Sequence, residues 1–406
     1  MYDLKNNISS IRAEFPILKD CVYLISNSLG AVPKNAQKGL KRYYNLWAKE
    51  GVSAWRKEWW DLSKNISNRI QGLLEAEKHS VTMMPNATIS HWIALSTKFT
   101  DHDHKRDKII MTDLDFPSSI YAVSKIAEFM GWKQEIIKSR TPYSLETQKI
   151  TERINDKTLF VATSHVCFKS SLIQDIHSIA EKAAKVGALT MIDGYHAPGI
   201  IPVNLKKTGI DFYIGGCLKW LCGGPGNAFL YVRPGLADKI QPSLTGWLAH
   251  KNPFAFDLDF TYTSGPYRFM SGTPPISCLY TASAGLDMIK KVGIKNIREK
   301  SISMTNTIIN KARERGFSIY SPQNKKLRGG AVSINLPHAF QIKQALELRK
   351  IRIDFRKGRT NKEDVLRIGP HFYNEISEID RLFQEIGNIY SSGEYQRFSD
   401  KIKHVT

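Results

Sequence analysis

Residues 188–232, ALTMIDGYHAPGIIPVNLKKTGIDFYIGGCLKWLCGGPGNAFLYV, decide the fold of this chain. The pattern predicts an apolar strand that ends at Asp193 and a second short apolar run over residues 211–216. Lys219 and a glycine-rich turn come next, and another strand follows the turn. An acid therefore stands at the carboxyl end of a strand, and a lysine follows it 26 residues later among small and apolar residues.

This pair suits pyridoxal phosphate (PLP), which needs an amine to hold it as a Schiff base and a carboxylate to keep its ring nitrogen protonated. Lys219 and Asp193 are the candidates for these two roles. Each also has an ordinary alternative, because an aspartate after a strand is usually a cap or turn residue and a lysine is usually a solvated charge. However, Leu218 and Trp220 flank the lysine, and apolar surroundings lower the pKa of an amine.

The stretch resembles the fold type I PLP enzymes of aminotransferase class V and, within that class, the kynureninase-like branch. The resemblance is carried by DGYH at 193–196 and by KWLCGGPG at 219–226, of which the GGPG tail is the more discriminating part. It implies that His196 lies near the cofactor ring and its hydroxyl, so that Lys219, Asp193 and His196 are the expected catalytic residues.

Composition limits the other possibilities. The chain has 406 residues with 42% hydrophobic and 10% aromatic content, which indicates a globular protein of two or three domains. It has no run of 18 apolar residues and no signal-peptide pattern in MYDLKNNISS, so we expect no membrane span and a cytoplasmic location. Its five cysteines are scattered without a C-x-x-C pair, which predicts reduced core residues and no metal site.

The charge is unusual, because 58 basic residues stand against 38 acidic residues and leave a formal net charge of +20. Such a field could attract nucleic acid, anionic lipid or acidic metabolites. The basic residues form many short clusters without a nucleic-acid-binding motif, so we expect a small amino-acid substrate as the partner and no nucleic acid. A PLP-fold protein that no longer catalyses and serves as a basic binding module remains an alternative.

Other candidates also follow predicted strands. A turn at Asn86 opens a helix, whose free N–H groups and dipole would suit a phosphate, and the family resemblance implies Ala87 and Thr88 as its ligands. Phe116 in FPSS matches the aromatic residue that stacks on PLP in kynureninases, whose motif generally ends in aspartate where Ser119 stands here. The run HVCFKSS from His165 resembles the family segment HVxFxTG, and this histidine could be structural or catalytic.

Strands and helices alternate over residues 80–235, which predicts an α/β fold with a mostly parallel, doubly wound sheet whose ligands bind at the carboxyl ends of its strands. With the resemblance, we expect a fold type I PLP-dependent transferase with three parts. These are an N-terminal segment at 1–45 that packs with the small domain and the active site, a large PLP-binding domain at 46–290, and a small α+β domain at 291–406.

The resemblance assigns four further residues. Asn27 in NSLG and Arg367 are expected to bind the substrate carboxylate, which an arginine can grip with two parallel hydrogen bonds. Trp247 in GWLAH and Thr273 in SGTPP are expected at the phosphate, with Gly272 and Thr273 reaching in from a neighbouring subunit. A homodimer with shared active sites is therefore implied.

The implied activity is that of kynureninase, a hydrolase that cleaves the Cβ–Cγ bond of 3-acyl-alanines. Three features depart from that pattern: Leu218 stands where kynureninases have a proton-transferring tyrosine, Ser119 replaces the aspartate, and residues 35–78 contain no histidine to contact an aryl group. A class V aminotransferase or a C–S or β-elimination lyase is the alternative. A cysteine desulfurase is less expected, because no cysteine follows Cys278.

Overall fold

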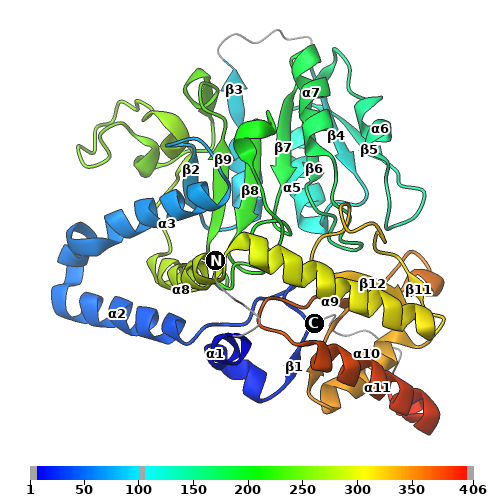
Figure 1. The fold of residues 1–406 in the computed structure, drawn as a ribbon. Helices are drawn as coiled ribbons and strands as arrows, with labels where there is room; N and C mark the ends of the chain where they lie inside the picture. Colours follow the sequence, from blue (N-terminus) through cyan, green and yellow to red (C-terminus); the bar gives the residue numbers. More distant parts are fainter. Residues whose placement is uncertain (1–6, 100–105, 400–406) are drawn as a thin grey trace.

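The computed structural model describes residues 7–99 and 106–399. Its centre is a seven-stranded sheet in the order β2-β9-β8-β7-β6-β4-β5, in which β9 alone runs antiparallel to its neighbours (Figure 1). The strands are β2 (Val81–Met84), β4 (Lys108–Thr112), β5 (Lys133–Ile137), β6 (Thr158–Ser164), β7 (Leu189–Asp193), β8 (Phe212–Gly216) and β9 (Ala228–Val232). The predicted mostly parallel sheet is confirmed.

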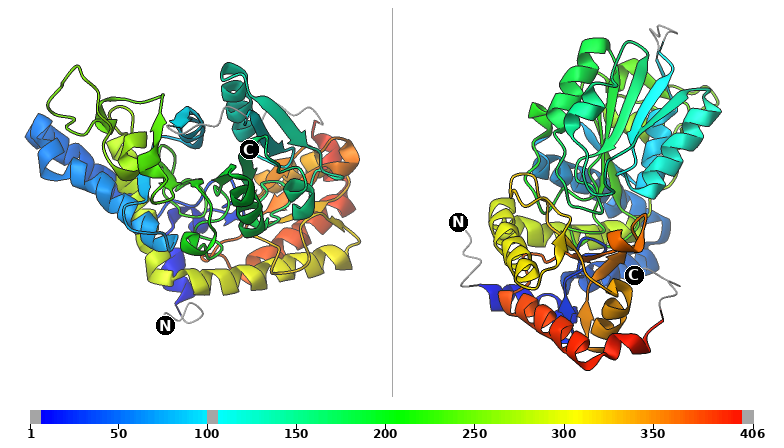
Figure 2. Two further views of the ribbon diagram at one scale, coloured as in Figure 1. Left: turned by 90° about the horizontal axis from the view of Figure 1, so that it is seen from above. Right: turned by 90° about the vertical axis from the view of Figure 1, so that its right-hand side faces the viewer.

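Both faces of this sheet are covered by helices, which explains why its inner strands are apolar along their whole length. In β8, Phe212 and Ile214 pack into the core beneath α4 and α5, whereas Tyr213 packs into the core on the opposite face. Figure 2 shows the two helical layers on either side of the sheet. The covering helices include α4 (Ala87–Leu95), α5 (Pro117–Phe129), α6 (Thr147–Thr151), α7 (Ile176–Val186), α3 (Trp60–Leu73) and α8 (Ile276–Val292).

Local signals in the sequence set the ends of these helices. The side chain of Asp175 accepts a hydrogen bond from the Ser178 N–H and so caps α7, which ends at Gly187 with a φ of +72°. Pro117 stands in the first turn of α5, where its missing N–H costs nothing. Pro117 thus marks the start of α5, one short turn after β4 ends at Thr112.

A second, four-stranded antiparallel sheet, ordered β11-β12-β15-β14, forms the core of the C-terminal region. It packs with α9, α10 and α11, and Figure 1 shows α9 running beside both parts of the molecule. The N-terminal segment joins this region, because β1 pairs with β13 in parallel. The elements are β1 (Val22–Tyr23), α9 (Ile294–Glu314), β11 (Ser318–Ile319), β12 (Val332–Asn335), α10 (Ala339–Leu348), β13 (Ile351–Arg352), β14 (Asp354–Arg356), β15 (Val365–Ile368) and α11 (Ile376–Ser392). The domain limits at 45 and 290 stay predictions.

The tryptophan-rich region forms an arm made of α2 (Asn35–Glu50), a π-helical turn (Trp55–Trp59) and α3, which projects to the left in Figure 1. Trp59 is buried in the large core. In contrast, Leu40, Tyr44 and Trp47 lie on one exposed face of α2. The aromatic residues of this arm therefore divide between the core and the surface.

The remaining elements are short. No helix in the two described ranges is both long and apolar enough to cross a membrane. Within the same ranges, no group of three or more potential metal-ligating side chains is found. The short elements include α1 (Ile8–Ala13), β3 (Thr97–Phe99), β10 (Ile240–Pro242) and the 3-10 turn at Trp247–Ala249.

Candidate active site

A cavity of about 210 Å³ lies where the carboxyl ends of β2, β4, β6, β7 and β8 meet. Parallel strands bring these ends to one edge of the sheet, so residues far apart in the sequence converge there. The lining residues are Ala87, Thr88, Phe116, Ser118, Ser119, Ser164, Val166, Phe168, Asp193, Tyr195, His196, Leu218 and Lys219. Six of the ten site residues that the sequence predicts are in this set.

Lys219 presents its amine to the cavity. Its Nζ atom lies 2.6 Å from Nε2 of His196 and 5.0 Å and 5.6 Å from the ring centres of Tyr195 and Phe116. Burial, with the positive charge of Arg367 as the second cause, lowers the pKa of Lys219 to about 7. A substantial fraction of this lysine is therefore a neutral nucleophile at neutral pH.

Asp193 lines the same cavity, and both of its carboxylate oxygens accept hydrogen bonds. Oδ1 accepts from the backbone N–H of Tyr195 at 2.9 Å, and Oδ2 accepts from the hydroxyl of Ser119 at 2.7 Å. The next residue must be glycine, because a Cβ on Gly194 would lie 2.0 Å from Cζ of Tyr213. The carboxylate is thus held on two sides and retains lone pairs for a further donor.

His196 is buried beside the lysine. Burial and, next, the positive charge of Lys219 lower the pKa of His196 well below its usual value. The imidazole is therefore neutral at neutral pH, so it can accept a hydrogen bond from an amine without adding a second positive charge.

The first turn of α4 forms a site for an anion. Asn86 caps this helix through its side chain, and helix N-termini direct unpaired N–H groups and a positive dipole outward. The hydroxyls of Thr88 and Ser118 lie 2.8 Å apart, so α4 and α5 each bring a donor to the same wall of the cavity. Ala87 begins the helix and lines the cavity as well.

Arg367 lies behind the cavity wall, on β15 of the second sheet. Its Nε atom donates to the Oδ2 atom of Asp354 at 2.7 Å, and an Nη atom donates to the carbonyl of Phe168. Both members of this ion pair are buried, and Arg356 donates to the other oxygen of Asp354 at 2.7 Å. Because the ring of Phe168 lines the cavity, the guanidinium is one side chain away from it.

Asn27 is buried near Arg367, and neither its amide nitrogen nor its amide oxygen has a hydrogen-bond partner. It contacts Gly369 so closely that a Cβ there would lie 2.1 Å from the Oδ1 atom of Asn27. A buried amide without partners carries a desolvation cost, which a bound ligand with donors and acceptors would relieve.

Two predicted residues, Trp247 and Thr273, lie outside the lysine cavity, and so does His165, whose role the sequence left open. Trp247 packs against Trp60 with ring centres 6.0 Å apart, and Thr273 is exposed and lines a different cavity of about 230 Å³. His165 is buried beside the site, where its Nδ1 atom is 3.0 Å from the Tyr213 hydroxyl and burial lowers its pKa to about 4. Within one chain, the structure does not bring these side chains to the lysine.

Sequence reasoning assigned no role to several residues that now contact the site. Tyr195 lies between two predicted residues, and Ser164 ends a predicted strand, so position alone could have singled them out. Asp354 carries no such signal, because its contact with Arg367 depends on the pairing of β14 with β15.

The residues present fit PLP. A lysine with a lowered pKa can react with its aldehyde, the held carboxylate of Asp193 can accept a hydrogen bond from its protonated ring nitrogen, and the hydroxyls of Thr88 and Ser118 at the starts of α4 and α5 can donate to its phosphate. Phe116, directly before α5, is 40% exposed and lines the cavity, which leaves a ring face on which a cofactor ring can stack.

Comparison with known proteins agrees with this geometry. The chain is 26% identical to a kynureninase of Pseudomonas fluorescens, over 99% of this chain and 97% of that protein. It is 28% identical to the uncharacterized aminotransferase YcbU of Bacillus subtilis (strain 168), over 92% of this chain and 96% of that protein. The apo structure of a cysteine desulfurase from Thermococcus onnurineus NA1 superposes with a TM-score of 0.82 at 22% identity, covering 95% of this chain and 98% of that one.

These likenesses share one architecture, the fold type I of PLP-dependent enzymes, which was the expected fold class. The family model described as aminotransferase class V matches residues 22–382, a span that includes both sheets and every residue lining the lysine cavity. The chain is therefore a member of the class V aminotransferase family of PLP-dependent enzymes.

Proposed function

We propose that this enzyme hydrolyses the Cβ–Cγ bond of an α-amino acid of the 3-acyl-alanine type, as a kynureninase does. The observation that carries the proposal is a cavity lined by Lys219, whose pKa is lowered, and by Phe168, against whose ring the guanidinium of Arg367 packs from behind the wall. Full-length similarity to kynureninases at 26–30% identity supports the same reaction.

Each residue has a part in this scheme. PLP, when bound, withdraws electrons from the substrate α-carbon. Neutral Lys219 accepts the α-proton, and Asp193 holds the proton on the ring nitrogen. We assign the α-carboxylate to Arg367 and the unpaired amide of Asn27; the guanidinium must then exchange one of its present partners, Asp354 or the Phe168 carbonyl, for the substrate.

Hydrolysis then adds one water to the γ-carbonyl and breaks the Cβ–Cγ bond, so that a 3-acyl-alanine gives alanine and a carboxylic acid. His196 is neutral and lies 2.6 Å from Lys219, which allows it to share the proton that the lysine takes up. The cavity also admits an apolar acyl group, since Val166, Phe168 and Leu218 contribute to its wall.

Leu218 favours a second candidate. Its side chain lines the cavity next to Lys219 and cannot transfer a proton, so the position directly before the lysine supplies no acid for a hydrolytic route. Transamination and β-elimination with C–S cleavage do not act on a γ-carbonyl, so they do not need a proton donor at that position. We keep these reactions as the alternative.

Product analysis separates these possibilities. The protein, reconstituted with PLP, is incubated with L-kynurenine, other 3-acyl-alanines, cysteine conjugates and common amino acids, with Lys219→Ala as the control. Alanine with an equimolar carboxylic acid supports hydrolysis, pyruvate with ammonia supports β-elimination, and a 2-oxo acid supports transamination. If no substrate reacts and no visible cofactor band forms, the chain is a binding module and the proposal is wrong.

We further propose a homodimer in which Thr273 completes the site of the partner chain. The exposed position of Thr273 and the exposed apolar face of α2 around Trp47 support this arrangement. Light scattering should then give about twice the 46.1 kDa mass of one chain. Inactive Lys219→Ala and Thr273→Val chains should regain activity when mixed, and a monomeric active enzyme would contradict the proposal.

A further inference from the structure

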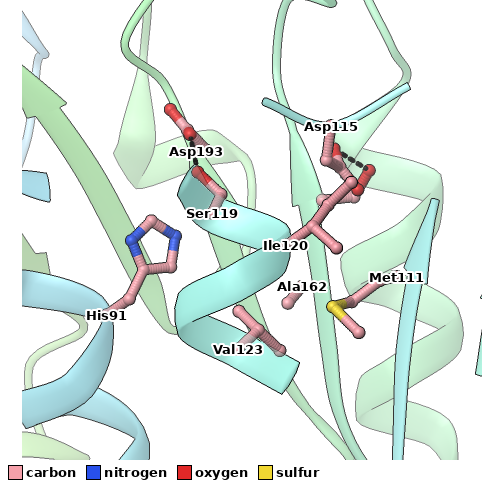
Figure 3. A pocket seen from close by; sticks show the side chains of 9 residues that line it. His91, Met111, Asp115, Ser119, Ile120, Val123, Ala162 and Asp193 are labelled. Carbon is pink, nitrogen blue, oxygen red and sulfur yellow. Dashed lines mark hydrogen bonds between the residues drawn. The ribbon is translucent and has the colours of Figure 1, made fainter. Parts of the chain in front are cut away.

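A second, smaller cavity adjoins the lysine cavity at Asp193 and Ser119, which line both (Figure 3). Its volume of about 10 Å³ corresponds to room for about one water molecule. His91, Asp115 and Thr163 supply the other polar side chains of its wall. Asp193 therefore faces the small cavity on the side away from the lysine cavity. The polar side chains around this small cavity determine how the carboxylate is held.

Ser119 makes the direct side-chain contact with Asp193. Its hydroxyl donates to Oδ2 at 2.7 Å, and its own position is fixed in the first turn of α5, where its N–H donates to the carbonyl of Phe116 at 2.9 Å. The serine is buried, so water does not compete freely for this hydrogen bond. The same helix start thus orients Phe116 at the front of the site and Asp193 at its base.

His91 cannot supply this hydrogen bond. Its Nδ1 atom lies 2.7 Å from the carbonyl oxygen of Ala87, which can only accept, so Nδ1 carries the hydrogen and Nε2 of the neutral ring is an acceptor. Burial lowers the pKa of His91, which keeps the ring neutral. In Figure 3 this ring points from α4 toward the first turn of α5.

Asp115 is also committed, because its oxygens accept from Thr112, Thr163 and Ser164. Among the described residues, six titratable or charged groups face Asp193. They are His91 of α4, Asp115 after β4, Tyr195 and His196 after β7, Tyr213 of β8 and Lys219 after β8. Ser119 is therefore the side-chain donor that this wall offers to Oδ2.

We propose that Ser119 is a positioning residue that fixes Asp193 against the ring nitrogen of PLP and offsets part of its charge by donating a hydrogen bond. This inference rests on the proposed PLP chemistry of the same site. The serine hydroxyl is uncharged, so it orients the carboxylate without adding a negative charge of its own beside the ring nitrogen.

The test compares Ser119→Ala, Ser119→Thr and a matched control, Ser124→Ala, which lies further along α5 and outside both cavities. We measure the dissociation constant of PLP by equilibrium dialysis and the pH midpoint of its visible absorption band. The unfolding midpoint of each cofactor-free variant reports whether the fold is intact.

Ser119→Ala should bind PLP roughly tenfold more weakly, the scale expected for one lost hydrogen bond to a charged group. Its band should titrate at higher pH, because a carboxylate without this donor makes the site more negative and favours the protonated form. Ser119→Thr should restore both values, and Ser124→Ala should change neither.

Two results would overturn the inference alone. In one, Ser119→Ala keeps the wild-type dissociation constant and pH midpoint, which makes the serine a packing residue. In the other, the threonine variant loses as much as the alanine variant while both remain folded, which makes local shape the cause. A wild-type protein that does not bind PLP overturns the proposed function and this inference together.

Discussion

The lowered pKa of Lys219 should control how fast the cofactor-free protein captures PLP. A lysine with the usual pKa of 10.5 is neutral in about 0.03% of molecules at pH 7, whereas one with a pKa of about 7 is neutral in about half of them. The concentration of the reactive amine therefore rises by roughly three orders of magnitude at neutral pH. Burial is the larger cause of this shift, and the charge of Arg367 adds to it.

The assay mixes cofactor-free protein with PLP between pH 5.5 and 9.5 and follows the visible band as the covalent link forms. The rate should level off above a midpoint near pH 7 and fall about tenfold for each pH unit below it, since only the neutral amine reacts. The phosphate of PLP also titrates near pH 6. Binding of pyridoxine 5′-phosphate, which lacks the aldehyde, measures that contribution separately.

Two charge variants test whether nearby charges set the pKa of Lys219. Asp193 raises the pKa of Lys219 and Arg367 lowers it, so Asp193→Asn should move the midpoint to lower pH and Arg367→Gln to higher pH. A wild-type midpoint above pH 9, or two variants that move it in the same direction, would refute the electrostatic account. A flat profile would show that a step other than amine attack limits the rate.

Three predictions concern stability and are measured by chemical unfolding. Ser171 has a left-handed φ of +63°, and its hydroxyl accepts a hydrogen bond from the Ala331 N–H. Ser171→Ala loses this hydrogen bond and should lower the free energy of unfolding by about 1–3 kcal/mol. Ser171→Gly loses the same bond but relieves about 1 kcal/mol of backbone strain, so it should cost less. Asp354→Asn leaves the buried Arg367 without its counter-charge and should cost about 3–5 kcal/mol. Lys125→Ala breaks only an exposed ion pair and should change stability by less than about 0.5 kcal/mol. Equal losses for Asp354→Asn and Lys125→Ala would contradict this ranking, as would a glycine variant at 171 that is less stable than the alanine variant.

Much of the fold and part of the candidate site follow from local sequence. Apolar runs bounded by small or polar residues predict β7 and β8, and they place Asp193 at the end of β7 and Lys219 just after β8. Parallel strands with crossover helices then require Thr88 and Phe116 to lie at the same edge of the sheet. These inferences succeed because strand direction and chain connectivity leave few alternatives.

The remaining contacts depend on packing between distant elements. The bond from Ser119 to Asp193 spans 74 residues, and the contact between Arg367 and the carbonyl of Phe168 spans 199. The sequence around Ser119 does not point to Asp193, and the sequence around Arg367 does not point to Phe168. The first contact depends on how the start of α5 packs against the central sheet, and the second depends on how the C-terminal sheet packs against it. The sequence by itself therefore determined the strands, the lysine and the acid, whereas the tertiary structure decided what holds that acid and which wall Arg367 stands behind. The physical reason is that strand and helix periodicity is a local property, whereas hydrogen bonds between elements require the packed geometry of the whole chain.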